Sequence, residues 1–290
     1  LQAHNNFDEL VDKNNPKFLK GEISPDGKIR GARVNVLPDG RKLDKAYSLL
    51  APNLIIHDET SNQHWDVIYQ NPNGKFAYLY TLDKIKNSNI NKYNKVKEFE
   101  KRIPQLKRNL AKALRNDELM ALPIYTLLNT HMRVGNEMYY QADGHKGLTT
   151  LKKKNIKIKK PFVTFRFIAK DGVPQTITKK FDKTYLAKLK EKLNKLKREN
   201  FVFTGETGHP LKDTEFENAF EQYTGKRFYP HIIRSYFATT TARKFLENEK
   251  TPTKEKVKAL YSGIAEELGH KKFSKKKQDW EISYTVTVHH

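Results

Sequence analysis

The sequence has no cysteine, no long hydrophobic run and no nucleotide-binding loop. Without cysteine there is no disulfide framework, no cysteine-based zinc or iron–sulfur site, and no thiol nucleophile. No stretch approaches the roughly 18 uninterrupted apolar residues that a membrane span needs, and residues 1–20 contain no apolar signal segment. The Gly-rich phosphate loop of helicases and ATPases is also absent. We therefore expect no membrane span, no secretory signal and no ATP-driven motor.

Negative charge is scarce relative to positive charge. The chain has 55 Lys and Arg against 33 Asp and Glu, a formal net charge of +22 at pH 7. Such an excess destabilises a compact chain by self-repulsion unless an anionic partner is near. With 37% hydrophobic and 11% aromatic residues the chain can still form cores. Basic residues concentrate in the runs 152–160, 183–198 and 271–277, which predicts a phosphate-binding surface. Together with the absence of a signal segment and of cysteine, this charge indicates an intracellular protein that binds nucleic acid.

Residues 1–92 have the pattern of a small antiparallel β domain. Short β-prone runs alternate with turn signals such as Pro38-Asp39-Gly40 and Asn71-Pro72-Asn73-Gly74. A further turn signal is Pro25-Asp26-Gly27. The polar stretch 86–94 then reads as a linker, which places a domain boundary at residue 92. The β-prone runs span residues 32–37, 53–56, 65–69 and 75–80.

Residues 93–290 have the pattern of a mainly helical domain. From residue 95 apolar side chains recur at three- and four-residue steps, and Pro104 is expected to kink or split this helix. Asp117 is a suitable N-cap for the next helix, in which Pro123 predicts a second kink. Gly269 is expected as the left-handed residue that follows the last helix. The later helices are expected at residues 182–200, 212–223, 231–248 and 253–268.

Two β-prone segments interrupt the helical domain. Residues 155–159, 162–169 and 173–179 predict a β-hairpin excursion that turns at Asp171-Gly172. Alternating apolar residues from Ile282 to Val288 predict a strand near the end of the chain. The expected fold class is therefore α+β, with a small antiparallel β N-terminal domain and a mainly helical second domain that contains a β-hairpin excursion.

The chemistry available to a nucleic-acid enzyme narrows once metal sites are considered. The second half of the chain shows no tight pair of carboxylates flanked by histidine, the usual holder of a catalytic divalent metal. Without a metal, Arg, Lys and His must neutralise the phosphoryl transition state and a side chain must attack. Such a site needs two arginines, a Lys or His as proton donor, and a Tyr or Ser nucleophile. We expect neither a metal nor a cofactor.

Short motifs within residues 120–275 supply these groups in the order Arg, Lys, His-x-x-Arg, Gly-His. They are Asn129–Asn136 around Arg133, Gly147–Lys152 (Gly-Leu-Thr-Thr-Leu-Lys), Phe167–Gly172 around Lys170, His231–Arg234, and Leu268–His270. In these motifs the chain resembles the type IB DNA topoisomerases, especially the small poxvirus-like and bacterial forms, whose catalytic domain is shared with the tyrosine recombinases. In the first domain, Gly74–Tyr80 resembles the family's Gly-x-x-x-Tyr-x-Tyr strand that contacts DNA, with Ala77 where a Gln is common.

The resemblance implies a role for each motif. Arg133 and Arg234 would hold the non-bridging phosphate oxygens, for which the planar guanidinium is well suited. His270 would donate to one of these oxygens, and Lys170 would protonate the leaving 5′-oxygen as general acid. His231 would assist as a second proton donor or as a phosphate contact. The residues expected to contact DNA are Lys75, Tyr78, Tyr80, Tyr140 and Lys152.

The nucleophile implied by the resemblance is a tyrosine that follows the Gly-His motif. The only candidate in the sequence is Tyr284, which lies fourteen residues after His270, farther along than in the poxvirus forms. An insertion around residues 275–280 would account for the longer spacing. Alternatively, residues 285–290 resemble the segment that precedes the nucleophile in bacterial forms and recombinases, which would put the tyrosine beyond residue 290. Both alternatives stay open.

The implied activity is relaxation of supercoiled DNA by transient cleavage of one strand through a 3′-phosphotyrosyl intermediate. The expected partner is double-stranded DNA, held by a monomer that acts as a clamp, in a bacterial cytoplasm or in a virion or infected cell. One alternative is a tyrosine site-specific recombinase, which usually carries a helical N-terminal domain. The other is a non-enzymatic basic DNA-binding protein.

Overall fold

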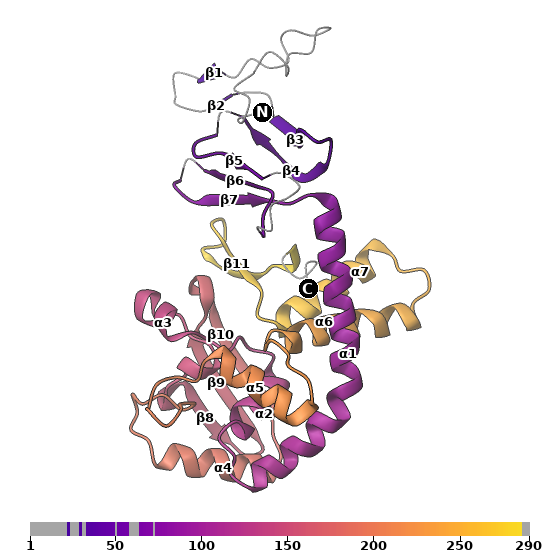
Figure 1. The fold of residues 1–290 in the computed structure, drawn as a ribbon. Coiled ribbons are helices and arrows are strands. Elements are labelled where there is room, and N and C mark those ends of the chain that lie inside the picture. The colour runs from indigo at the N-terminus through magenta and orange to yellow at the C-terminus, as the bar shows by residue number, and fades with distance from the viewer. Residues whose placement is uncertain are drawn as a thin grey trace. The chain divides into compact units, whose positions relative to one another are not determined.

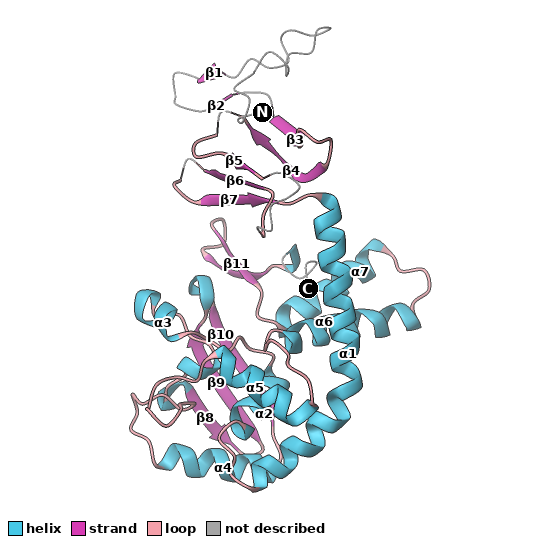
Figure 2. Ribbon diagram, viewed as in Figure 1, coloured by secondary structure: helices cyan, strands magenta, loops and turns pink. Residues whose placement is uncertain are grey.

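The computed structural model describes residues 22–23, 29–30, 33–49, 51–57, 64–71 and 73–285. Short antiparallel strands come first along the chain and helices dominate afterwards, which confirms the predicted α+β fold class (Figures 1 and 2). The chain divides into two compact units, residues 1–92 and residues 93–290. Within the described ranges, no helix is long and apolar enough to cross a membrane.

The first unit is built from short antiparallel strands around a small core. Each predicted run contains a strand, whereas β4 was not predicted, because Lys45 lies between the buried Leu43 and Tyr47 and breaks the alternation. The turn expected at residues 25–27 lies outside the described residues. The strands are β1 (Glu22–Ile23) paired with β2 (Ile29–Arg30), β3 (Arg33–Val36) with β4 (Lys42–Ser48), and β5 (Ile55–Ile56), β6 (Val67–Gln70) and β7 (Phe76–Leu79) in one sheet.

The linker predicted at residues 86–94 is wrong, because these residues lie inside the long helix α1 (Leu82–Arg115). The helix was hidden in the sequence because its first three turns are mostly polar and largely exposed, so no buried apolar stripe marks them. Its buried stripe begins at Val96 and continues through Ile103 and Leu106 on both sides of Pro104. The proline removes one backbone hydrogen bond, yet the helix runs through it unbroken.

Helix α2 (Ala121–Thr130) starts later than predicted. Its N-cap position is Met120, whereas Asp117 has a left-handed backbone (φ 57°) and does not cap the helix. Pro123 produces no break, because it lies in the first turn, where its missing N–H has no helical partner to lose. The helix ends at His131, which is itself left-handed (φ 52°) and turns the chain toward Arg133.

The β excursion is confirmed as a three-stranded antiparallel sheet in the order β10-β9-β8. Its strands are β8 (Ile156–Lys159), β9 (Phe162–Ile168) and β10 (Pro174–Lys180), and the turn between β9 and β10 contains Asp171 and Gly172 as predicted. The four later helices are also confirmed, with ends shifted by a few residues, and α3 was not predicted. These helices are α3 (Glu137–Asp143), α4 (Lys183–Asn194), α5 (Asp213–Thr224), α6 (Ile232–Asn248) and α7 (Lys254–Glu267).

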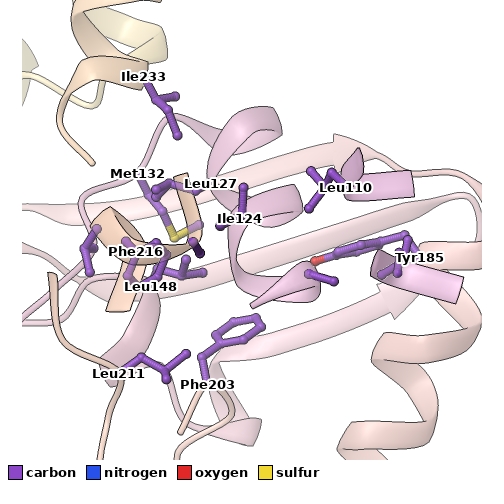
Figure 3. Packing of buried hydrophobic residues seen from close by; sticks show 14 of the residues in the cluster. Leu110, Ile124, Leu127, Met132, Leu148, Tyr185, Phe203, Leu211, Phe216 and Ile233 are labelled. Atoms are coloured by element: carbon purple, nitrogen blue, oxygen red, sulfur yellow. The ribbon is translucent and has the colours of Figure 1, made fainter. Parts of the chain in front are cut away.

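The main core of the second unit joins these helices to the sheet. Figure 3 shows Ile124 and Leu127 of α2 packed among side chains of α1, α4 and α5, with Phe216 and Tyr185 fully buried. Met132 and Ile233 belong to the same core and lie next to the two arginines of the predicted site. Because burial of such side chains holds neighbouring backbone in place, the core fixes the segments that carry Arg133 and Arg234.

A two-stranded hairpin, β11 (Lys271–Ser274) with β12 (Asp279–Ile282), follows the Gly-His motif. Gly269 has the left-handed conformation (φ 67°) that was predicted for the residue after α7. The strand predicted at residues 282–288 is wrong in part, because β12 ends at Ile282 and Tyr284 begins a tight helical turn. Residues 286–290 lie outside the described residues.

Candidate active site

Two adjoining hollows in the second unit bring together the predicted catalytic residues other than Tyr284. The larger, of about 470 Å³, is lined by Arg133, Lys170, His231 and Arg234. The smaller, of about 120 Å³, shares Arg133, Lys170 and Arg234 and adds His270. The hollows therefore form one site with a shared wall, to which α6, the β9–β10 turn and the segments after α2 and α7 contribute.

Arg133 is positioned by a close backbone contact between two of the sequence motifs. The N–H of Leu148 donates to the carbonyl of Arg133 (2.8 Å), and the N–H of Thr149 donates to the carbonyl of Val134 (2.7 Å). A Cβ atom on Gly147 would lie 2.6 Å from the carbonyl oxygen of Arg133 and 2.5 Å from the backbone nitrogen of Gly135. Gly147, the first residue of Gly-Leu-Thr-Thr-Leu-Lys, must therefore lack a side chain for the Arg133 segment to pack against it.

Gly147→Ala is expected to displace the Arg133 segment. The backbone of Gly147 is extended (φ −134°), so the alanine brings a steric clash without φ strain. We expect a loss of about 1–3 kcal/mol in the free energy of unfolding, with slower DNA cleavage, measured by urea denaturation and a suicide-substrate assay. Gly263→Ala in α7, where an added Cβ meets nothing within 4 Å, should leave both unchanged or add stability. Equal behaviour of the two variants would contradict this account.

Arg234, in the first turn of α6, is the most buried charge of the site, with 3% of its surface exposed. It donates to the carbonyl of His131 and, through Nη2, to the carbonyl of Leu268 and to Nε2 of His270, each at 3.0 Å from Nη2. Its buried Nε has no hydrogen-bond partner among the described residues. Burial and the nearby Arg133 guanidinium lower the pKa of Arg234 to about 9. The site therefore holds an uncompensated positive charge, which is the condition that favours an anion.

The remaining predicted groups surround this guanidinium. His231 is at the N-cap position of α6, one helical turn before Arg234, so the two side chains share a face of the helix. Lys170 is exposed at the β9–β10 turn, where Asp171 (φ 62°) and Gly172 (φ 75°) are both left-handed. His270 is buried, with 7% of its surface exposed, and its Nε2 accepts from Arg234. Donation by His270 to a phosphate therefore requires Nδ1 or the release of this contact.

The backbone beside Tyr284 contacts the candidate site, but the side chain of Tyr284 does not line it. The N–H of Ser283 donates to the carbonyl of His270 (2.9 Å), which brings the residue next to Tyr284 alongside the Gly-His motif. The side chain of Tyr284 is 37% exposed and lines neither hollow. Attack by Tyr284 would therefore require a rearrangement of the chain after β12.

The predicted DNA contacts lie outside the hollows. In the first unit Tyr78 and Lys75 are exposed, whereas Tyr80 is half-buried and packs its ring edge-on against His64. In the second unit two lysines approach the Tyr140 ring, with Nζ of Lys146 at 4.8 Å and Nζ of Lys152 at 5.5 Å from its centroid. Hydrogen bonds with Tyr140 and Glu199 raise the pKa of Lys152, which keeps this lysine charged.

The structure also shows site residues that the sequence interpretation did not select. The carbonyl of His131 accepts from Arg234, and its ring stacks on Phe237 (ring centroids 4.3 Å apart) and contacts Glu267 through Nδ1 (2.9 Å). Lys179 also donates to Glu267 (2.6 Å). His131 and Glu267 are adjacent to the Arg133 and Gly-His motifs, but their pairing joins residues 136 apart in sequence, which no local pattern could indicate.

Glu267→Gln tests the importance of this contact through its pH dependence. Burial raises the pKa of Glu267, but the hydrogen bonds from His131 and Lys179 outweigh burial and hold it below its usual value. The contribution of this carboxylate to stability is therefore present above its ordinary pKa and is lost as pH falls through the lowered one. We expect the variant to be less stable by about 1 kcal/mol at pH 7, with the gap closing below pH ~4.3, in urea titrations. A gap independent of pH would contradict this.

No three His, Cys, Asp or Glu side chains gather in the described ranges in a way that could hold a metal ion. The charged groups of the hollows are mainly cationic, and Asp143, Asp171 and Asp213 are the carboxylates on the wall of the larger one. Asp213 accepts from the hydroxyl of Tyr229 (2.9 Å). Burial raises the pKa of Asp213, so this carboxylate offsets less of the positive charge than a solvated one would.

Comparison with known protein families matches residues 82–286 to the family described as eukaryotic DNA topoisomerase I, catalytic core. A curated relative, DNA topoisomerase 1B of Acanthamoeba polyphaga mimivirus, is 24% identical over 236 residues, which cover 74% of this chain and 69% of the relative. These matches define an enzyme of the type IB DNA topoisomerase class. The chain belongs to the family of the eukaryotic DNA topoisomerase I catalytic core.

A solved structure of the XerH site-specific recombinase bound to its difH substrate is also similar, with a TM-score of 0.40 and 16% identity. The similar region covers 64% of this chain and 48% of that chain, so it spans about half of the recombinase. At this distance the likeness carries no argument about activity, and the family match alone places the chain among the topoisomerases.

Proposed function

We propose that the chain relaxes supercoiled duplex DNA by transesterification, without ATP or a metal. A tyrosine oxygen attacks a phosphodiester, the bond from phosphorus to the 5′-oxygen breaks, and a 3′-phosphotyrosyl link and a free 5′-hydroxyl result. The broken strand rotates about the intact one before the 5′-hydroxyl attacks in reverse. Because the energy of the phosphodiester is kept in the covalent intermediate, no nucleotide is consumed.

The observation that carries this proposal is the buried, incompletely paired guanidinium of Arg234 beside Arg133. A transition state of phosphoryl transfer spreads negative charge over its non-bridging oxygens, and preorganised cations in a dry site stabilise it strongly. Arg133 and Arg234 are assigned to these oxygens. Lys170 is assigned to the leaving 5′-oxygen, and His270 and His231 to further phosphate contacts. The site is poised for an anion because its own carboxylates do not neutralise Arg234.

The first test is relaxation of a negatively supercoiled plasmid in EDTA without ATP. A topoisomerase should relax a single circle to completion under these conditions. A tyrosine recombinase should need a second DNA site, and a passive DNA-binding protein should leave the topology unchanged. Failure to relax any plasmid, with DNA binding intact, would contradict the proposal. Sedimentation of the complex tests the further expectation that one chain acts alone as a clamp on duplex DNA.

Lys170→Ala is expected to show whether the lysine supplies the proton to the leaving oxygen. General acid catalysis is worth about 10²- to 10⁴-fold, so cleavage of an ordinary substrate should slow by this order. A substrate with a 5′-bridging sulfur needs no such proton, since the thiolate leaves unprotonated, and it should restore most of the rate. Lys170→Arg is a matched control that keeps the charge. A variant that sulfur does not rescue would assign Lys170 to phosphate binding instead.

A further inference from the structure

The hairpin β11–β12 has two chemically different faces. In the register of the hairpin, Phe273 pairs with Trp280 and Lys271 pairs with Ile282. Because cross-strand partners share a face, these two pairs form one face, on which the Phe273 and Trp280 rings meet edge to face at 5.7 Å. The other face carries Lys272, Ser274, Asp279 and Glu281, and Lys272 pairs with Glu281 (3.3 Å). The hairpin is thus an amphipathic ribbon.

The base of this ribbon is fixed to the candidate active site. The N–H of Ser283 donates to the carbonyl of His270 (2.9 Å), and Nζ of Lys271 donates to the carbonyl of Pro174 (3.0 Å). Gln175, next to Pro174, donates to the carbonyl of Gly269 (2.7 Å). Pro174 opens β10, directly after the turn that carries Lys170. The ribbon therefore leaves the protein from beside Lys170 and His270.

Within the second unit, the aromatic face of the ribbon is left partly exposed. Phe273 is 47% exposed and Ile282 is 39% exposed. A two-stranded hairpin alone is marginally stable in water, and exposed apolar faces of this kind usually meet a partner. Figure 1 draws the ribbon in yellow at label β11, apart from the helices that pack around the main core.

The charge of the ribbon indicates which partner it meets. Residues 271–282 contain five lysines against two carboxylates. Lys277 pairs with Glu281 (3.3 Å), whereas Lys275 and Lys276 at the tip have no ion pair with any described carboxylate. A polyanion fits this tip, and a two-stranded ribbon has the dimensions that the DNA major groove admits. An uncharged protein surface would leave the tip lysines without partners.

We propose that the ribbon 271–282 docks in a groove of duplex DNA beside the phosphodiester that is cut, an interaction that rests on the proposed function. Phe273, Trp280 and Ile282 contact sugars and base edges, and Lys275 and Lys276 contact phosphates of the backbone. The anchors at His270 and Pro174 hold the ribbon in register with the site. The long spacing between His270 and Tyr284 thus encodes a DNA-contacting element.

Trp280 supplies a direct probe, because the chain contains only two tryptophans. In a Trp65→Phe background, Trp280 is the sole indole, and its quenching by acrylamide reports its exposure. We expect a duplex that contains a cleavable site to reduce this quenching severalfold. Trp280 that stays equally accessible at saturating DNA would overturn the proposal. Protection that appears without DNA at high protein concentration would assign the face to a second copy of the chain and would also overturn it.

The tip lysines are tested by the salt dependence of DNA binding. Each phosphate neutralised adds about −0.9 to the slope of log K against log salt, so Lys275→Gln with Lys276→Gln should reduce the slope by about 1.8. The matched control is Lys254→Gln with Lys258→Gln, two exposed lysines of α7 that lie outside the three basic runs and line neither hollow. The control should leave the slope unchanged, and equal slopes for tip variant and unmodified chain would refute the phosphate contacts.

The absence of cysteine gives a further positional test. Lys276→Cys creates a single thiol at the ribbon tip that can carry an iron–EDTA group. We expect hydroxyl radicals from this group to cut the duplex next to the phosphodiester that the enzyme cleaves. Cuts elsewhere, in a protein that still relaxes plasmids, would overturn the ribbon proposal and leave the proposed function intact. A chain that neither binds nor relaxes DNA would overturn both.

Discussion

Arg234→Ala is expected to slow DNA cleavage by about 10²- to 10³-fold while DNA affinity stays nearly unchanged. The guanidinium is buried, and its Nε lacks a partner among the described residues, so it is available to charge that develops at phosphorus. Removing one preorganised donor of this kind costs roughly 3–4 kcal/mol in the transition state. Binding depends on many phosphate contacts, of which this is one. Single-turnover cleavage and filter binding measure the two quantities separately.

The same helix offers a matched control for this variant. Arg243 of α6 is partly exposed, pairs with Glu100 and Glu247, and lines neither hollow. Arg243→Ala removes an equal charge at the surface, where ion pairs contribute little, and should leave cleavage unchanged. Arg234→Ala also removes donors from the carbonyls of His131 and Leu268, so unfolding must be followed in parallel. A large loss of affinity at a normal cleavage rate would contradict the assigned role.

The parts of the fold that the sequence predicted are those with a one-sided apolar pattern. The stripe from Val96 to Leu114, the three strands of the β excursion and helices α4 to α7 all bury one face in the main core or against a neighbouring helix. The mostly polar first turns of α1 were misread as a linker because their few apolar residues bury no continuous face and so leave no periodic signal. Strand β4 was missed for the opposite reason, since the exposed Lys45 interrupts its buried residues.

The residues of the candidate site could be predicted from the sequence, but the contacts between those residues and their neighbours could not. Arg133, Lys170, His231, Arg234 and His270 lie in motifs whose order was visible, and they line adjoining hollows. Their catalytic roles stay predictions. The contact of His131 with Glu267 and the donation from Arg234 to His131 depend on how α2, α6 and α7 pack together. Such long-range pairs leave no periodic trace in one sequence.

The pairing of strands in the ribbon also could not be predicted from the sequence. Its lysines were visible as a basic run, and the alternation that follows them suggested a strand. The sequence did not show that Phe273 faces Trp280, because the register of a hairpin depends on the turn that joins its strands. That turn contains Gln278 in a left-handed conformation (φ 52°), which is uncommon for glutamine. The basic run alone therefore predicted a phosphate-binding surface but not the structured ribbon that carries it.

Tyr284→Phe is expected to abolish covalent capture of DNA, if Tyr284 is the nucleophile, while non-covalent binding persists. The substitution removes only the hydroxyl oxygen that would form the bond to phosphorus, so no other group can replace it. Tyr284 follows Ser283, whose N–H donates to the carbonyl of His270, so the backbone next to Tyr284 lies beside the Gly-His motif. Trapping on a suicide substrate, followed by peptide mapping of the adduct, measures the outcome.

Tyr229→Phe is the matched control, because this hydroxyl lines the larger hollow but is already donated to Asp213. Burial, together with the hydrogen bond to Asp213, raises the pKa of Tyr229 to about 12, so its phenolate is disfavoured at neutral pH. Capture should survive this change. If the unmodified 290-residue chain binds DNA but forms no adduct, and a chain extended beyond residue 290 does, the nucleophile lies downstream. Tyr284 would then act in packing, and the assignments of Arg133, Lys170, Arg234 and His270 would stand, because separate segments carry them.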